Sequence, residues 1–184
     1  MPEPTHQIVF FGSQRLGNPP RFSHTWAVIQ KRLPNRSRTA AFAPLAISWL
    51  PESLEIKFRG PPESGKNFSH RETMDWVRAG RAQVKYWGPF AATEELFDLC
   101  EDRIRQLNSG ELRYVMLDRR YRPHEATNCI HAVSDLDLAW ELLDTDTLRG
   151  FQASKKVLDC LKKRRLVLDA VKPSPELAEF LKGI

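Results

Sequence analysis

The residues best suited to chemistry lie between Ala126 and Asp135, in the run ATNCIHAVSD. Thr127 or Asn128 could cap a helix, which would leave Cys129 in the first turn among unpaired backbone N–H groups. The positive end of a helix dipole favours thiolate over thiol, and the same N–H groups could hold an oxyanion. The pattern therefore predicts a nucleophilic cysteine.

The same cysteine also fits a purely structural role. Cys129 begins an apolar stripe with helical spacing that would face a core. The other members of this stripe are Ala132, Val133, Leu136, Trp140 and Leu143. A cysteine on such a stripe is usually an inert small hydrophobic residue. The local pattern alone leaves both interpretations open.

A thiolate nucleophile needs a base that is held by a rigid element. His24 suits this role best, because the run SHTWAVIQ over 23–30 is rich in β-branched and aromatic residues and predicts a strand. His70 is explained as a surface residue in the first turn of a helix, since Ser69 and Glu72 form a capping box around it. We therefore expect His24 to be the base.

His131 follows Cys129 by two positions, so it would project roughly 200° around a helix from the cysteine. A local pair with Asp135 at i+4 is a simpler role for His131. A metal site built from His24, Cys129 and His131 is a weaker alternative, because no fourth ligand lies at a suitable spacing. We expect no metal and no cofactor.

The elements that must position these residues follow from periodicity and turn signals. The sequence predicts a mostly antiparallel sheet packed on helices, an α+β domain. Pro44 implies an edge strand or a bulge, and the Gly- and Pro-rich segment 60–67 is expected to be a loop. We expect strands over 7–11, 23–30, 39–49, 54–58, 82–87, 112–117 and 166–168, and helices over 69–80, 93–110, 129–144, 151–163 and from 174 onward.

Length and charge narrow the classes of function. The 184 residues suffice for one domain with a substantial core, and the net charge of +5 is spread among acidic residues. The densest basic run, Lys162–Arg165, is typical of a solvated helix face, so we expect no nucleic-acid partner. Three widely spaced cysteines indicate a reducing compartment. No segment reads as an export signal or a membrane span, so the expected location is cytoplasmic, and the oligomeric state stays open.

The order of a strand histidine in SHTWA and a later helix opening with NCIH resembles the circularly permuted papain-like folds of the NlpC superfamily, in particular lecithin retinol acyltransferase-like proteins. The resemblance spans about His24 to Trp140. It implies a sheet that carries the base, packed on a helix that carries the nucleophile. It also implies thiol chemistry on amide or ester bonds. We expect residues 1–150 to form this domain and 151–184 to be a C-terminal helical extension packed on it.

In that family a third residue orients the base from the neighbouring strand. A hairpin turn near Asn35-Arg36 would place His24 opposite Ile47 or Ser48, so Ser48 is the matching polar position. The resemblance thus implies a Cys129–His24–Ser48 hydrolase or acyltransferase acting on a peptide, amide or lipid-ester substrate. The alternative is a catalytically inactive binding or scaffolding domain of the same fold. Substrate contacts are expected from Trp26, Trp49 and Asn128.

Overall fold

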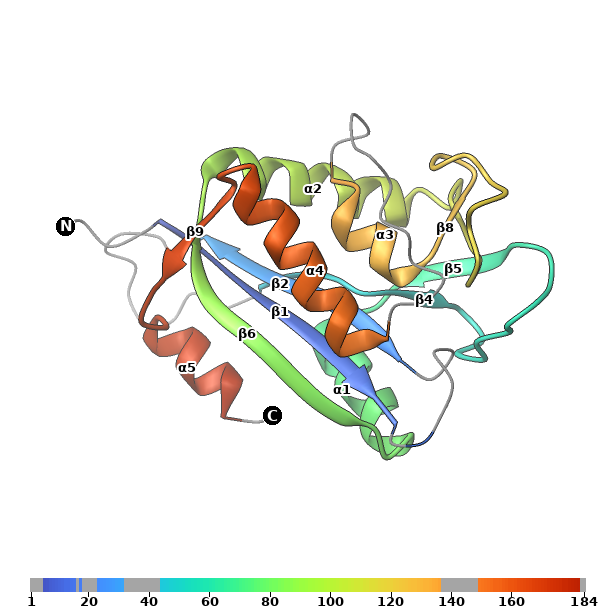
Figure 1. The fold of residues 1–184 in the computed structure, drawn as a ribbon, viewed down its shortest axis with the longest axis horizontal. Coiled ribbons are helices and arrows are strands. Elements are labelled where there is room, and N and C mark those ends of the chain that lie inside the picture. The colour runs from blue at the N-terminus through green and yellow to red at the C-terminus, as the bar shows by residue number, and fades with distance from the viewer. Residues whose placement is uncertain (1–4, 16, 18–22, 32–43, 137–148, 183–184) are drawn as a thin grey trace.

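The computed structural model describes residues 5–15, 17, 23–31, 44–136 and 149–182 (Figure 1). In this part of the chain an antiparallel sheet lies against helices, which confirms the predicted α+β class. The sheet has the order β3-β2-β1-β6-β9, from β1 (His6–Gln14), β2 (His24–Lys31), β3 (Leu45–Ile47), β6 (Gln83–Ala92) and β9 (Val167–Ala170). A second sheet has the order β4-β5-β7-β8, from β4 (Trp49–Pro51), β5 (Glu63–Asn67), β7 (Arg113–Tyr114) and β8 (Ala126–Thr127).

Helices cover both faces of the five-stranded sheet (Figure 1). One face packs against α2 (Glu94–Asn108), α3 (Cys129–Ser134) and α4 (Gly150–Lys163). The other face packs against α1 (His70–Ala79) and α5 (Pro175–Leu181). The alternation of side chains along a strand produces this division. Phe10 and Ile29 enter the first core, whereas Phe11 and Trp26 enter the second.

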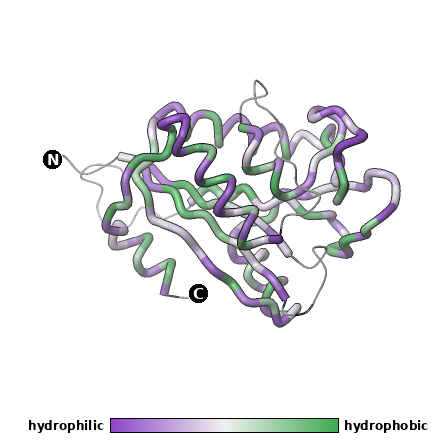
Figure 2. The backbone as a smooth tube through the Cα atoms, in the orientation of Figure 1, coloured by the Kyte–Doolittle hydropathy of each residue, from purple (hydrophilic) through white to green (hydrophobic). Residues whose placement is uncertain are grey.

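Burial on both faces explains why the two central strands are so apolar. Seven consecutive residues of β2 and eight of β1 are buried. Figure 2 shows the hydrophobic colour running along these strands, whereas the helices alternate between hydrophobic and hydrophilic. None of the helices in the described ranges is long and apolar enough to span a membrane.

Most predicted helices are confirmed, because their capping residues are strong local signals. Ser69 and Glu72 form the capping box of α1, Thr93 caps α2, and Ser174 caps α5, which has a proline in its first turn. Helix α4 lies where the sequence predicts it, and β9, expected over 166–168, forms over Val167–Ala170. Residues after Gly150 thus add a strand to the main sheet as well as two helices.

The prediction was wrong between residues 54 and 67. No strand forms over 54–58, and Glu63–Asn67, expected to be a loop, forms β5. Strand β5 lies between β4 and β7. A Cβ atom on Gly65 would lie 2.0 Å from the ring of Trp49, so glycine lets the indole lie against the strand. The glycine that looked like a turn signal is required by packing.

Three other predicted boundaries were also wrong. The strand expected over 82–87 is longer, because β6 continues through Gly88-Pro89, opposite a register shift in β1. The strand expected over 112–117 is shorter, because β7 covers only Arg113–Tyr114. Helix α3 ends at Ser134 rather than near residue 144. The positions Trp140 and Leu143 of the expected stripe, and the expected turn at 35–36, lie outside the described residues. Strand β3, which begins after Pro44, is an edge strand as expected.

Candidate active site around Cys129 and His24

Asn128 is the residue that caps the cysteine helix. Its Oδ1 accepts hydrogen bonds from the backbone N–H groups of Ile130 and His131, both at 2.9 Å. Its Nδ2 donates to the carbonyl of Met116 at 3.4 Å. Asn128 is buried and occupied by these contacts, so the structure gives it a role in shaping the loop instead of the expected contact with substrate.

Asp118 anchors the start of the helix, and sequence reasoning missed it. Its Oδ2 accepts a hydrogen bond from the N–H of Asn128 at 3.1 Å and lies 2.5 Å from Nδ1 of His131. The aspartate and the histidine are both buried. The Nδ1 partner of His131 is therefore Asp118. Asp135 accepts from the hydroxyl of Ser134 at 2.7 Å; burial raises the pKa of Asp135, and the nearby His131 acts to lower it.

Arg103 of α2 holds the other end of α3. Its guanidinium donates to the carbonyl groups of Ala132 and His131, each at 3.3 Å, and only 3% of the side chain is exposed. Positive charge near the last carbonyl groups of a helix is stabilising. The six-residue helix is thus fixed at both ends, which gives Cys129 a defined position despite the short length.

The Cys129 thiol lies beside the backbone of Thr25 in β2. The backbone N–H groups of Thr25, Cys129 and Ile130 act to lower its pKa, but burial outweighs them and raises the pKa of the thiol to about 11. The nearby Asp118 carboxylate raises it further. The balance of these effects favours a neutral thiol at neutral pH over the thiolate expected from the helix terminus.

His24 is fully buried at the start of β2. Its ring stacks on Trp26 with 5.3 Å between centroids and meets the edge of Trp76 at 5.8 Å. Burial lowers the pKa of His24 to about 3, because a charged imidazolium loses its hydration there. His24 is therefore a neutral imidazole in the resting protein.

Ser48 meets His24 as the sequence predicted, although the predicted register was wrong. Nε2 of His24 lies 2.9 Å from Oγ of Ser48. In the observed pairing Ala27 faces Ile47, so the register differs from the expected one by more than one residue. The contact between His24 and Ser48 forms in spite of this difference, because β3 ends at Ile47 and Ser48 lies between β3 and β4, outside both strands.

A chain of hydroxyl groups fixes the tautomer of His24. The Thr73 hydroxyl donates to the carbonyl of Ser69 at 2.8 Å, which uses its single proton. Oγ of Ser48 lies 2.6 Å from the Thr73 hydroxyl, so Ser48 must donate to Thr73. Ser48 then has only lone pairs left for His24. It follows that Nε2 of His24 carries the hydrogen and Nδ1 does not.

Nδ1 of His24 is buried and accepts no hydrogen bond from any described residue. It is therefore not hydrogen-bonded to Cys129, in contrast to the close contact that the sequence led us to expect. The His24 ring packs with α1, whereas α3 lies on the other face of the sheet. The thiol nevertheless contacts the backbone of Thr25, the residue after His24.

The two tryptophans expected to contact substrate belong to the core. Trp26 and Trp49 are each 0% exposed. The indole of Trp26 donates to Nδ1 of His70 at 3.1 Å, and that of Trp49 donates to the carbonyl of Thr127 at 3.2 Å. The expectation that these two tryptophans contact substrate was therefore wrong. The large rings fill the interior instead, Trp49 against Gly65 and Trp26 against one face of the sheet. His70 is half-buried by this contact and not a surface residue.

The first turn of α4 packs closely against the backbone of Ser13 and His24. A Cβ atom on Gly150 would lie 2.2 Å from the carbonyl oxygen of Ser13 and 2.9 Å from that of His24. Ser154 of the same helix donates to the carbonyl of Phe11 at 2.6 Å. Glycine permits this close approach of helix to sheet. The segment after residue 150 thus fixes the backbone of His24.

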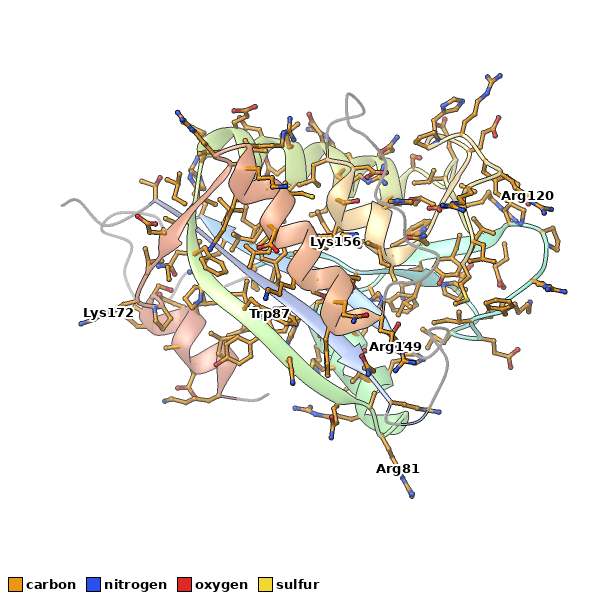
Figure 3. The ribbon with its side chains drawn as sticks, in the orientation of Figure 1. Arg81, Trp87, Arg120, Arg149, Lys156 and Lys172 are labelled. Atoms are coloured by element: carbon orange, nitrogen blue, oxygen red, sulfur yellow. The ribbon has the colours of Figure 1, made fainter. Side chains whose placement is uncertain are left out.

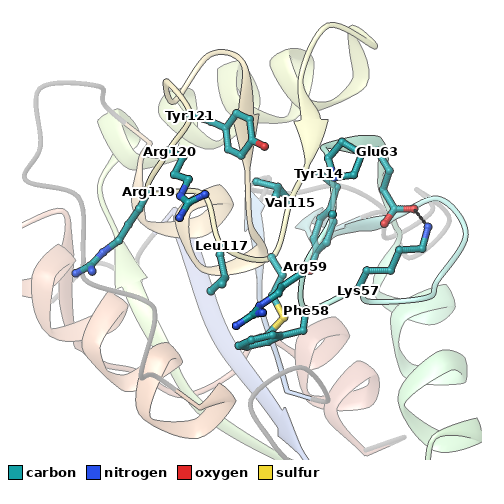
Figure 4. A pocket seen from close by; sticks show the side chains of 13 residues that line it. Lys57, Phe58, Arg59, Glu63, Tyr114, Val115, Leu117, Arg119, Arg120 and Tyr121 are labelled. Atoms are coloured by element: carbon teal, nitrogen blue, oxygen red, sulfur yellow. Dashed lines mark hydrogen bonds and ion pairs between the residues drawn. The ribbon is translucent and has the colours of Figure 1, made fainter.

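Two cavities lie near these residues. One, of about 830 Å³, has Tyr114 in its wall (Figure 4). Burial raises the pKa of this phenol, and the nearby Cys129 raises it further. The other, of about 520 Å³, is lined by Trp76, which contacts His24. Within the described residues, no group of three or more His, Cys, Asp or Glu side chains could hold a metal ion, so the alternative site of His24, Cys129 and His131 is not assembled there.

No protein-family model, curated protein or solved structure matches this chain.

Proposed function

We propose that this protein is a thiol-dependent hydrolase or acyltransferase, with Cys129 as nucleophile and His24 as general base. The observation that carries the proposal is the tautomer of His24. Ser48 holds Nε2–H and leaves the basic Nδ1 without a partner among the described residues, while the thiol contacts the backbone of the next residue, Thr25. Buried polar atoms are usually hydrogen-bonded, and a role as base would account for the unpartnered Nδ1.

In the proposed reaction, Nδ1 accepts the proton of the thiol as sulfur attacks the carbonyl carbon of an ester or amide. The tetrahedral oxyanion is stabilised by backbone N–H groups near the sulfur, those of Cys129 and Thr25. The oxyanion collapses and expels the alcohol or amine, which takes the proton from Nδ1 of the imidazolium. Water or an acceptor nucleophile then attacks the thioester and regenerates the thiol.

The resting protonation states decide the kind of base catalysis. Burial raises the pKa of Cys129 and lowers that of His24, so a preformed thiolate–imidazolium pair is strongly disfavoured. Proton transfer must therefore accompany the attack, as in general base catalysis. Geometry in a free enzyme is often loose and tightens when substrate binds, which accommodates the absence of a direct hydrogen bond.

The arrangement also supports the permuted papain-like interpretation as a proposal. A strand carries the base and a short helix carries the nucleophile, in that order along the chain. A hydroxyl from the segment that follows the neighbouring strand orients the base. Peptides, other amides and lipid esters suit this chemistry as substrates.

A second function is favoured by the burial of both groups. Only 8% of Cys129 and none of His24 is exposed. Such a pair also suits a catalytically inactive domain of the same fold that binds a partner. Catalysis and binding make opposite predictions for the variants described next.

The test is hydrolysis of p-nitrophenyl acetate, a small activated ester, by the parent and three variants. Cys129→Ala should abolish the protein-dependent rate, and His24→Ala should lower it by about a hundredfold, the usual range for a general base. Cys160→Ala is the matched control and should keep the parent rate. Equal rates in the parent and Cys129→Ala would refute the enzyme and favour the binding domain.

A further inference from the structure

The larger cavity is lined by two loops, one over 57–61 and one over 115–121, with Tyr114 of β7 between them (Figure 4). Its volume of about 830 Å³ lies within the range of roughly 300–1,000 Å³ that small-molecule sites occupy. Apolar side chains, among them Val115 and Leu117, contribute to the wall. The cavity is therefore large enough for a small organic ligand and has an apolar surface for it.

The lining of this cavity is strongly cationic. Lys57, Arg59, Arg119 and Arg120 line it, and Glu63 is the one carboxylate among the lining residues. Lys57 and Glu63 form an ion pair at 3.3 Å, so these two charges offset each other. The remaining lining carries an excess of positive charge, which favours an anionic ligand.

Two of the guanidinium groups are available to such a ligand. Arg59 and Arg120 are exposed and make no ion pair with a carboxylate of any residue in the described ranges. They come from different loops, and Figure 4 shows both side chains at the cavity. A guanidinium matches the oxygens of a phosphate with two parallel hydrogen bonds. Two arginines from separate loops could hold one phosphate group.

Aromatic rings accompany these charges. Phe58 is 45% exposed, which is unusual for so large an apolar side chain, and Arg59 lies 6.0 Å from its ring. Tyr121, on the other loop, is half-buried in the lining. Exposed aromatic rings beside arginines are the groups on which nucleic-acid bases stack. Carboxylate ligands without a ring would not use Phe58 or Tyr121.

We infer that this cavity binds a nucleoside phosphate, with its phosphate on Arg59 and Arg120 and its base against Phe58 or Tyr121. The ligand is either a free nucleotide or one nucleotide of a single strand, since both present the same groups. This site is separate from the basic run at 162–165, which lies at the end of α4. It also goes beyond the proposed thiol chemistry.

The experiment is isothermal titration calorimetry of the full chain at fixed ionic strength. The probes are AMP, adenosine, inorganic phosphate and a short single-stranded oligonucleotide. AMP should bind more tightly than adenosine or phosphate, because each of those two offers only one of the two groups. Arg59→Ala/Arg120→Ala should weaken AMP binding by about tenfold or more, since both charge-assisted contacts are lost. Phe58→Ala should weaken AMP more than phosphate.

The matched control is Lys156→Ala/Lys172→Ala, which removes two charges elsewhere on the surface (Figure 3). This control should keep AMP affinity within about twofold of the parent, after allowance for general electrostatics. Equal weakening by both double variants, or AMP binding no tighter than phosphate, would overturn the inference. So would an absence of AMP binding by a parent with an intact melting transition.

The oligonucleotide identifies the source of the ligand. If it binds more tightly than AMP and loses affinity in Arg59→Ala/Arg120→Ala, the site takes a nucleotide of a strand. If it binds no more tightly than AMP, the site takes a free nucleotide. The titrations measure binding and do not depend on catalytic turnover. Their outcome is therefore independent of whether Cys129 is a nucleophile.

Discussion

Removal of the Ser48 hydroxyl tests the chain of hydrogen bonds that fixes His24. Ser48→Ala removes the acceptor of Nε2–H at 2.9 Å and the donor to Thr73 at 2.6 Å, inside a fully buried cluster. One neutral hydrogen bond contributes about 1 kcal/mol net, and an unsatisfied buried group costs about 1–3 kcal/mol. We expect kcat/KM to fall about tenfold, equivalent to about 1.4 kcal/mol, and the free energy of unfolding to fall by about 1–3 kcal/mol.

A substitution at Thr73 tests the tautomer of His24 and leaves His24 and Ser48 unchanged. In Thr73→Val, the Ser48 proton loses its acceptor and becomes free to be donated to Nε2 of His24. Nδ1 would then carry the hydrogen in part of the molecules, and those molecules would lack the base. We expect a severalfold loss of kcat/KM in Thr73→Val and the parent rate in Thr73→Ser.

The assay is ester hydrolysis at fixed pH, with urea unfolding of each variant to separate activity from folding. A Thr73→Val protein that is as fast as the parent, beside a slow Ser48→Ala protein, would refute the reasoning about the tautomer. A Ser48→Ala protein with the parent rate would show that another group orients His24.

Two further predictions concern protonation. Iodoacetamide labelling near pH 7.5, followed by peptide mapping, should modify the half-buried Cys160 before Cys129 and Cys100. The reason is that burial raises the thiol pKa of Cys129 to about 11 and that of Cys100 to about 12. Early labelling of Cys129 would contradict this prediction. Burial also lowers the pKa of His24 to about 3 and that of His70 to about 4, so the unfolded chain binds more protons below pH 6.5 and stability should fall as the pH drops from 6.5 toward these values. The loss due to His24 is about 2 kcal/mol at pH 5 by linkage, and urea unfolding should show a flatter pH dependence in His24→Gln than in the parent.

The sequence predicts the helices better than the second sheet, for physical reasons. Capping residues such as Ser69, Thr93 and Asn128 act within one turn, so a local pattern identifies them. Strand β5 depends on Trp49 lying against Gly65, and β7 has two residues. Such elements are stabilised by contacts that are distant in sequence, which no local pattern contains.

The site shows the same division between local and distant causes. The family resemblance and an assumed hairpin register predicted the contact between Ser48 and His24, which forms although the register was wrong. Thr73 and Asp118 were missed because each acts through a fold-dependent contact, the first from inside α1 and the second from a loop. Helix position favours the thiolate, but the sequence does not reveal how deeply the thiol is buried.

A short reaction with an acyl donor, followed by peptide mass spectrometry, tests the proposed chemistry most directly. The proposal predicts that p-nitrophenyl acetate leaves an acetyl group on the peptide that contains Cys129, and that the adduct forms far more slowly in His24→Ala under the same conditions. It also predicts that the adduct disappears with time as water releases the acyl group. Acetylation confined to lysines or to Cys160, or equal acetylation of Cys129 with and without His24, would contradict it.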